Sequence, residues 1–206
     1  MLRNLITISL IAWQFASADI NETNALAEIL LSLDDTTFVA IDTETTGLNP
    51  QLDRIIEIGV VKFKAGKIIE RKDWLIDPEM TIPLEAINVH GITDEMVKGK
   101  PHFKEVYPKL IAFIKDTTLL AHNAAFDERF LEVETNRLEK TPSLTNPVIC
   151  TIRLCRTWFP ELKSYQLSEL VKTFDLEPGE YHRALGDAEH LSHLFIHATG
   201  TLGHHL

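Results

Sequence analysis

The sequence contains little cysteine, with 2 cysteines among 206 residues. Cys150 and Cys155 lack the CxxC spacing of zinc sites and redox motifs, which argues against both kinds of site. If both lie on one helix, they point about 140° apart, so a disulfide between them is not expected. We therefore expect two free thiols in or near the hydrophobic core.

The sequence is also poor in positive charge. It has 20 Lys and Arg residues against 30 Asp and Glu residues, which gives a net charge of −10. A protein that coats duplex DNA through its phosphates usually carries a basic face, so this balance argues against such binding. It favours a confined site in which metal ions supply the positive charge.

The first 20 residues form an apolar segment with two possible interpretations. Arg3, the apolar run from Leu5 to Trp13 and the sequence Ala16-Ser17-Ala18 match a secretory signal, which predicts a mature chain that begins at Asp19. The alternative is an N-terminal helix packed on the domain, although its apolar residues surround the helix. The segment is too short to span a membrane, so no membrane is expected in the mature form.

The length of the chain predicts one α/β domain, and no internal repeat or low-complexity segment divides it. We assign residues 1–20 to the apolar segment, 21–200 to the domain and 201–206 to a short tail. A predicted hairpin of strands precedes an alternation of strands and helices. This order predicts a mixed central sheet, an antiparallel hairpin plus parallel strands, flanked by helices. Besides the strand that begins at residue 39, strands are predicted at 55–63, 67–76, 118–122 and 147–150, and helices at 21–35, 101–115, 124–140, 151–158, 166–174 and 184–199, with residues 87–96 as a loop that leads to a short helix capped by Thr93.

Two carboxylates lie at the end of the first predicted strand. Asp42 and Glu44 follow the apolar residues 39–41, and Thr45, Thr46 and Gly47 then end the strand. Residues two apart in a strand point to the same face, so both carboxylates project into one spot. Two adjacent anions favour a hard divalent cation such as Mg²⁺ or Mn²⁺. Pairs of this kind are common on solvated surfaces, so the prediction depends on partners elsewhere in the chain.

Two later segments supply such partners. Asp127 lies in the first turn of a predicted helix, where a carboxylate is also favoured by the helix dipole alone. Asp187 occupies a similar place in the last predicted helix, and His182 precedes that helix in a loop. The spacing of His182 and Asp187 differs from that of a zinc pair stacked on a helix, which favours separate tasks for the two residues.

Together, these segments resemble a known enzyme family. Asp-x-Glu at 42–44, His-Asn-x-x-Phe-Asp at 122–127 and His-Arg-Ala-Leu-x-Asp-Ala at 182–188 are similar to the three motifs of the DEDDh 3′→5′ exonucleases. The family includes the proofreading epsilon subunit of bacterial replicative polymerases and has a ribonuclease H-like fold. The resemblance covers residues 38–195, and residues 88–94 and 167–170 are also similar to family segments.

The resemblance implies a division of tasks among the polar residues. Asp42, Glu44, Asp127 and Asp187 would hold two Mg²⁺ or Mn²⁺ ions, and His182 would be the general base. An imidazole suits this task because its neutral form can accept the proton of an attacking water.

Two further residues are similar to the family positions that contact the terminal nucleotide. Thr45 would do so through its backbone, and Leu48 would pack on a base. The implied activity is a two-metal-ion 3′→5′ exonuclease that releases nucleoside 5′-monophosphates from single-stranded or frayed DNA 3′ ends.

The sequence leaves alternatives to this function open. An exoribonuclease that acts on short RNA is one, because no residue is identified that reads a 2′-hydroxyl. A non-catalytic, proofreading-like scaffold is another, although the complete set of four acids and His182 argues against it. A polymerase partner is possible, without an evident tether in the sequence. The resemblance implies a cytoplasmic location, with export as the alternative.

Three histidines of the last predicted helix could form a separate metal site. His190, His193 and His197 share one helix face by their spacing. No carboxylate orients them in the sequence pattern, so we interpret this face as a polar helix face.

Overall fold

The computed structural model describes residues 33–138, 144–176 and 181–203. Both interpretations of residues 1–20 lie outside the described residues, and so does most of the helix predicted at 21–35. Export and a cytoplasmic location therefore stay predictions. Among the described helices, none combines the length and the apolar character that crossing a membrane requires.

The described residues form one sheet of five strands in the order β3-β2-β1-β4-β5. The first three strands pair antiparallel, whereas β4 pairs parallel to both β1 and β5. The predicted combination of an antiparallel hairpin with parallel strands is confirmed. The strands are β1 (Thr37–Thr45), β2 (Ile55–Lys64), β3 (Lys67–Leu75), β4 (Thr118–Ala121) and β5 (Val148–Cys150).

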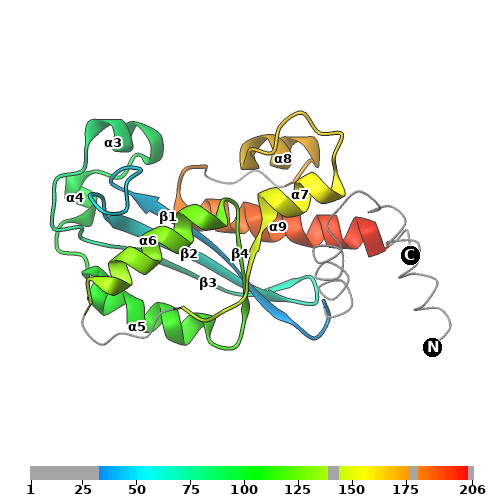
Figure 1. Ribbon diagram of the computed structural model, residues 1–206, viewed down its shortest axis with the longest axis horizontal. Helices are drawn as coiled ribbons and strands as arrows, with labels where there is room; N and C mark the ends of the chain where they lie inside the picture. The colour runs from blue at the N-terminus through cyan, green and yellow to red at the C-terminus, as the bar shows by residue number, and fades with distance from the viewer. Residues whose placement is uncertain (1–32, 139–143, 177–180, 204–206) are drawn as a thin grey trace.

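Helices cover both faces of this sheet (Figure 1). Most of their bounds lie within a few residues of the predicted ones. In the described part of the chain they are α3 (Leu84–His90), α4 (Asp94–Val97), α5 (Phe103–Ile114), α6 (Ala124–Asn136), α7 (Thr151–Trp158), α8 (Leu167–Thr173) and α9 (Ala184–Gly203).

The prediction for residues 87–96 was partly wrong. Ile87 to His90 form the last turn of α3, which ends at Gly91 with a positive φ of 72°. Thr93 does occupy the N-cap position of α4, but its side chain makes no capping hydrogen bond. The Asp94 carboxylate instead accepts a hydrogen bond from the backbone N–H of Ile82, and this contact fixes the turn.

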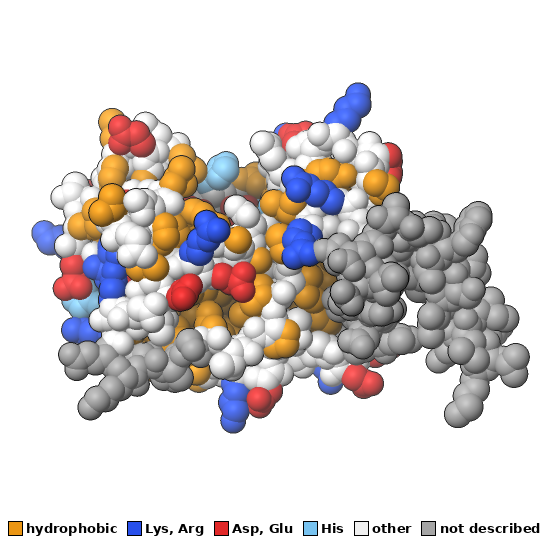
Figure 2. Space-filling view, viewed as in Figure 1, with side chains coloured by type: hydrophobic (Ala, Val, Ile, Leu, Met, Phe, Trp, Pro, Cys, Tyr) orange, Lys and Arg blue, Asp and Glu red, His pale blue; other side chains and the backbone are white. Residues whose placement is uncertain are grey.

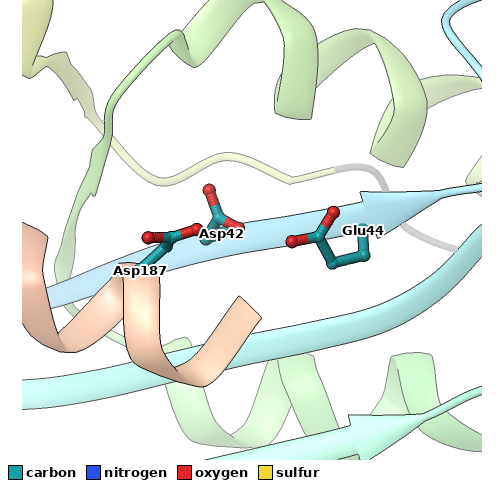
Figure 3. Close-up of side chains that lie close together, drawn as sticks. All are labelled: Asp42, Glu44 and Asp187. Carbon is teal, nitrogen blue, oxygen red and sulfur yellow. The ribbon is translucent and has the colours of Figure 1, made fainter. Parts of the chain in front are cut away.

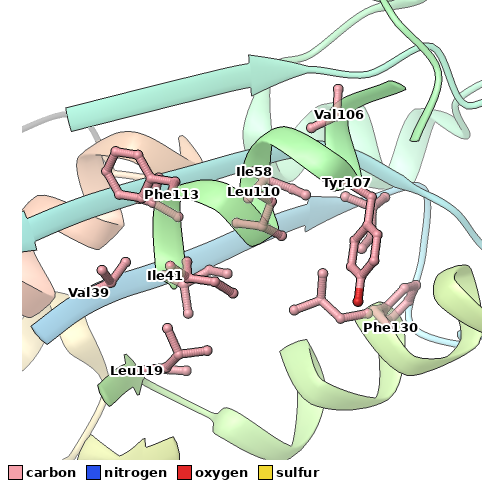
Figure 4. Close-up of a cluster of buried hydrophobic side chains, with 14 of the residues drawn as sticks. Val39, Ile41, Ile58, Val106, Tyr107, Leu110, Phe113, Leu119 and Phe130 are labelled. Atoms are coloured by element: carbon pink, nitrogen blue, oxygen red, sulfur yellow. The ribbon is translucent and has the colours of Figure 1, made fainter. Parts of the chain in front are cut away.

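The side chains of β1 alternate between two hydrophobic layers. Val39 and Ile41 pack with α5 and α6 on one face of the sheet (Figure 4). Phe38 and Ala40 pack with α7 and α9 on the other face. Since alternate residues of a strand point to opposite faces, this pattern decides which helices each polar residue further along β1 meets.

The two cysteines match their prediction. Cys155 is buried, Cys150 is partly buried and both are free thiols. Burial raises the pKa of the Cys155 thiol to about 12, so it remains protonated at physiological pH. Cys155 packs with Leu170 and Leu194, which joins α7, α8 and α9 in a small separate core.

Candidate active site

Asp42, Glu44 and Asp187 come together at one end of the sheet. Asp42 and Glu44 continue the face of β1 that packs against α9, and Asp187 lies in the first turn of that helix. One carboxylate oxygen from each residue lies within 4.8 Å of the other two. Figure 3 shows the carboxylates of β1 and the side chain of Asp187 on the same side of the strand. The structure thus brings together the acidic residues of the first and third motifs.

The electrostatics of this cluster favour a cation. Burial, together with the charges of Asp127, Glu44 and Asp187, raises the pKa of Asp42 well above its usual range. Burial and the nearby Asp187 raise the pKa of Glu44 to about 8. Such groups lose protons reluctantly because each new charge faces other charges in a poorly solvated place. A set of oxygen ligands with this repulsion fits a hard divalent cation.

Asp127 reaches the site from the opposite face of the sheet. It is 4% exposed, and its carboxylate accepts a 2.8 Å hydrogen bond from the hydroxyl of Thr43. Thr43 points away from Asp42 and Glu44, as strand alternation requires. Asp127 therefore lines the same cleft but lies outside the cluster of three. Burial raises its pKa to about 7, although the hydrogen bond from Thr43 opposes this shift.

His182 lies in the loop before α9, as predicted, and its exposed imidazole lines the cleft. Its backbone N–H donates a 2.9 Å hydrogen bond to the Asp187 carboxylate. Its φ of 58° is in the left-handed region, which non-glycine residues adopt at a cost. The hydrogen bond and the strained backbone together set the direction in which the imidazole leaves the loop.

The start of α9 is positioned by residues that sequence reasoning did not select. Gly59 lies opposite Asp42 on β2, and a Cβ atom there would lie 2.1 Å from the backbone carbon of Ala184. Glu57 lies opposite Glu44 and forms an ion pair with Arg183 at 2.5 Å. The absence of a side chain at Gly59 lets α9 approach the sheet closely. The only sequence feature that could have indicated these supporting residues was the polar Glu57 within a nearly continuous apolar strand.

The two predicted nucleotide-contact residues lie at and after the end of the strand that carries Asp42 and Glu44. The Thr45 side chain is buried and donates a hydrogen bond to the carbonyl of Gly47. Leu48 is 85% exposed in the loop that follows. Arg137, directly after α6, donates hydrogen bonds to the Pro50 and Gln51 carbonyls of this loop, which holds it in place.

A cleft of about 760 Å³ joins the four acidic residues and His182 to α7 and α8. The surface is hollowed between the α3 side and the α7–α8 side (Figure 2). Besides the acidic residues and His182, the lining includes polar and basic side chains from β4 to α8. They are His122, Asn123, Arg156, Lys163, Ser164, Tyr165, Gln166 and Ser168.

The polar face predicted for the α9 histidines is buried at His190. This residue is 1% exposed and its ring stacks on Tyr181 with a centroid distance of 4.5 Å. His197 packs against Phe174. The reason is that α9 packs against the sheet and also contacts α8, so little of its surface stays free. The cation site found among the described residues includes none of these histidines.

The mixed sheet and its clustered carboxylates together define a nuclease with a ribonuclease H-like fold. The profile of the exonuclease family RNase_T matches residues 39–195. The chain belongs to this family and carries the DEDDh type of motif set, that of metal-dependent 3′→5′ exonucleases.

Individual relatives agree with this assignment. A PolC-type DNA polymerase III from Halalkalibacterium halodurans is 42% identical over 170 residues, which cover 82% of this chain and 12% of that protein. The structure of exonuclease X in complex with 5′ overhanging duplex DNA has 33% identity and a TM-score of 0.67, and covers 81% of this chain and 93% of that chain. The nuclease domain of 3′hExo, a DEDDh family member bound to rAMP, covers 78% of this chain and 90% of that chain with a TM-score of 0.68. At its 20% identity, this last likeness shows the fold alone.

Proposed function

We propose that this chain is a two-metal-ion 3′→5′ exonuclease that acts on single-stranded or frayed DNA ends and releases nucleoside 5′-monophosphates. The observation that carries the proposal is the grouping of Asp42, Glu44 and Asp187 within 4.8 Å in an open cleft. Four acids and a histidine on one cleft meet the needs of metal-assisted hydrolysis better than those of a scaffold.

Asp42, Glu44 and Asp187 would hold divalent cations, and Asp127 would complete the ligand set from α6. When bound, two such cations lower the pKa of an attacking water and stabilise the charge that develops on the leaving oxygen. The raised pKa values of Asp42, Glu44 and Asp127 support this assignment, because bound cations relieve the repulsion that causes part of the Asp42 and Glu44 shifts.

His182 would accept the proton of the attacking water. Its exposed imidazole lies on the cleft, and its backbone N–H is bonded to Asp187, so base and carboxylate share one rigid turn. Leu48 would pack on the terminal base, and the backbone of Thr45 would contact the terminal nucleotide. The exposure of Leu48 supports this role, because its apolar side chain is accessible for packing on a base.

DNA is the proposed substrate because the relative with 33% identity was solved in complex with DNA. A polymerase partner is a further proposal, which the PolC-type relatives support. This chain spans about 12% of the length of that relative.

Digestion of 3′-labelled substrates tests the function. The purified chain is incubated with single-stranded DNA, duplex DNA or short RNA, in Mg²⁺, Mn²⁺ or EDTA, and products are separated by chromatography. We expect metal-dependent release of nucleoside 5′-monophosphates from single-stranded DNA, and none with the Asp42→Asn variant. Release from RNA alone would replace DNA by RNA as the substrate, and no release in any arm would overturn the proposal.

A further inference from the structure

The wall of the cleft formed by α7 and the α7–α8 connection carries two cations that the proposed reaction does not use. Arg156 of α7 and Lys163 of the connection line the same cleft as Asp42 and Asp187. Both side chains are exposed to solvent. Within the described part of the chain, no carboxylate forms an ion pair with either of them. Their charges are therefore available to an anionic ligand in the cleft.

Arg156 is held in place by contacts that extend back to the catalytic strands. Its guanidinium lies 5.6 Å from the centroid of the Tyr165 ring, a cation–π contact. The Tyr165 hydroxyl donates a 2.8 Å hydrogen bond to the carbonyl of Phe159. The Tyr165 carbonyl accepts a 2.8 Å hydrogen bond from Nε2 of His122, at the end of β4. Arg156 is thus fixed relative to the sheet that carries the carboxylates.

The two sides of the site differ in chemistry. The loop after β1 and α3 lie on one side, where Leu48 and Val89 are exposed apolar residues (Figure 1). The other side is formed by α7 and α8, and Lys and Arg side chains gather over α7 (Figure 2). An unstacked base favours the apolar side, whereas an anionic phosphodiester backbone favours the basic side.

We propose that Arg156 and Lys163 form a binding site for the phosphates on the 5′ side of the scissile bond. This inference rests on the proposed function, which places the 3′-terminal nucleotide at the carboxylates and directs the rest of the strand along the cleft. In a chain with a net charge of −10, these two local cations hold the substrate strand without a basic face. The site takes single-stranded nucleic acid through its backbone and does not read its bases.

Two substrates distinguish an effect on this phosphate site from an effect on the catalytic centre. The p-nitrophenyl ester of thymidine 5′-monophosphate has one phosphodiester and no nucleotide on its 5′ side, whereas a short oligothymidylate has several. The double variant Arg156→Ala, Lys163→Ala is compared with wild type on both. The matched control is Lys104→Ala, Lys109→Ala, which removes the same charge from exposed positions of α5.

The variant should keep the kcat/KM for the ester within about 2-fold, since the ester does not reach the basic wall. Its KM for the oligonucleotide should rise about 10-fold or more, because two charge-assisted contacts are lost. The logarithm of the binding constant for the oligonucleotide decreases with the logarithm of the salt concentration. The slope should become shallower by about 1.4, since each phosphate contact of a single strand contributes about 0.7. The control should match wild type in all three measurements.

Binding of the 5′-labelled oligonucleotide, followed by fluorescence anisotropy in Ca²⁺, gives a readout that does not need turnover. Weaker binding by the double variant than by the control would support the phosphate site, whether or not the protein cleaves DNA. Absence of cleavage by every chain would overturn the proposed function but not the phosphate site. Equal affinity and an equal salt slope in variant and control would overturn the site. An equal loss on the ester and the oligonucleotide would also overturn it, because the two residues would then act on the catalytic centre.

Discussion

Glu57 of β2 binds both Arg183 and the backbone N–H of Ala184, and so fixes the first turn of α9 to the sheet. The Ala184 N–H donates to Glu57 at 2.8 Å, and the Arg183 guanidinium donates to both carboxylate oxygens. Glu57 is fully buried. Because Asp187 lies in the same turn and His182 just before it, one buried carboxylate positions two residues of the proposed site.

The first prediction concerns Glu57→Gln, which keeps the shape of the side chain but removes its charge. We expect it to lower the free energy of unfolding by about 3 kcal/mol, because the buried ion pair between Glu57 and Arg183 loses one of its two charges. Activity should fall by more than the loss of folded protein explains, because the first turn of α9, which carries Asp187, is no longer fixed to β2. Urea unfolding and kcat on single-stranded DNA measure the two effects. Glu70→Gln, which breaks a surface pair with Lys72, should change both little; equal effects of the two variants would contradict the prediction.

The second prediction concerns Gly59, where the backbone of Ala184 at the start of α9 lies close to the sheet. Gly59→Ala should lower the melting temperature and the activity together, because its Cβ would lie 2.1 Å from the Ala184 backbone and push α9 away. Gly200→Ala is the matched control within α9, since a Cβ atom there would have open space within 4 Å. That change should raise stability by about 0.5 to 1 kcal/mol through helix propensity. A Gly59→Ala enzyme with wild-type melting and activity would show that α9 tolerates displacement.

The third prediction concerns the repulsion among the carboxylates. In EDTA at pH 8, Asp42→Asn should melt at a higher temperature than wild type, because the variant has no carboxyl group whose charged form burial and the neighbouring carboxylates disfavour. Mg²⁺ should raise the melting temperature of wild type more than that of the variant, since the ion compensates the same charges. Asp116→Asn removes an exposed charge two residues before β4 and should show neither effect. A variant that melts below wild type in EDTA would contradict the assignment.

The fourth prediction gives the pH dependence of the metal-free protein. The pKa of Glu44 rises from 4.5 to about 8 on folding, and that of Asp127 rises from 3.8 to about 7. A raised folded-state pKa means that the folded protein holds the proton more tightly, so the stabilisation is complete below about pH 4 and is lost as pH rises to about 8. Thermal melts in EDTA across this range should show falling stability, and saturating Mg²⁺ should flatten the fall. Rising stability between about pH 5 and 8 in EDTA would contradict this linkage.

The fifth prediction concerns His182 as the base. His182→Asn should lower kcat by about 10² to 10⁴-fold with little change in substrate binding, because a base acts in the transition state. Asparagine tolerates the left-handed backbone at this position, so the variant separates proton transfer from strain. The acidic limb of the pH–rate profile should disappear with the imidazole. Loss of metal affinity with an unchanged acidic limb would show that His182 orients Asp187 instead.

The sequence by itself determined the elements of the fold and most of the proposed site. Strand alternation placed Asp42 and Glu44 on one face, and the hairpin predicted from the strands at 55–63 and 67–76 accounts for the antiparallel pairing of β2 and β3. These features are local, since they depend on residues a few positions apart. The ordered motifs then predicted that Asp187 would join the pair, and the structure brings the three together.

Only the tertiary structure decided how the site is supported. Glu57 and Arg183 are 126 positions apart, and no periodicity links them. The burial of His190 also depends on packing, because its helical spacing is the same whether that face meets solvent or another element. Asp127 accepts a hydrogen bond from Thr43, a contact between α6 and the sheet that its place at a helix start does not specify. Local patterns fix which groups a strand or helix presents, whereas the docking of α6, α7 and α9 on the sheet fixes what those groups meet.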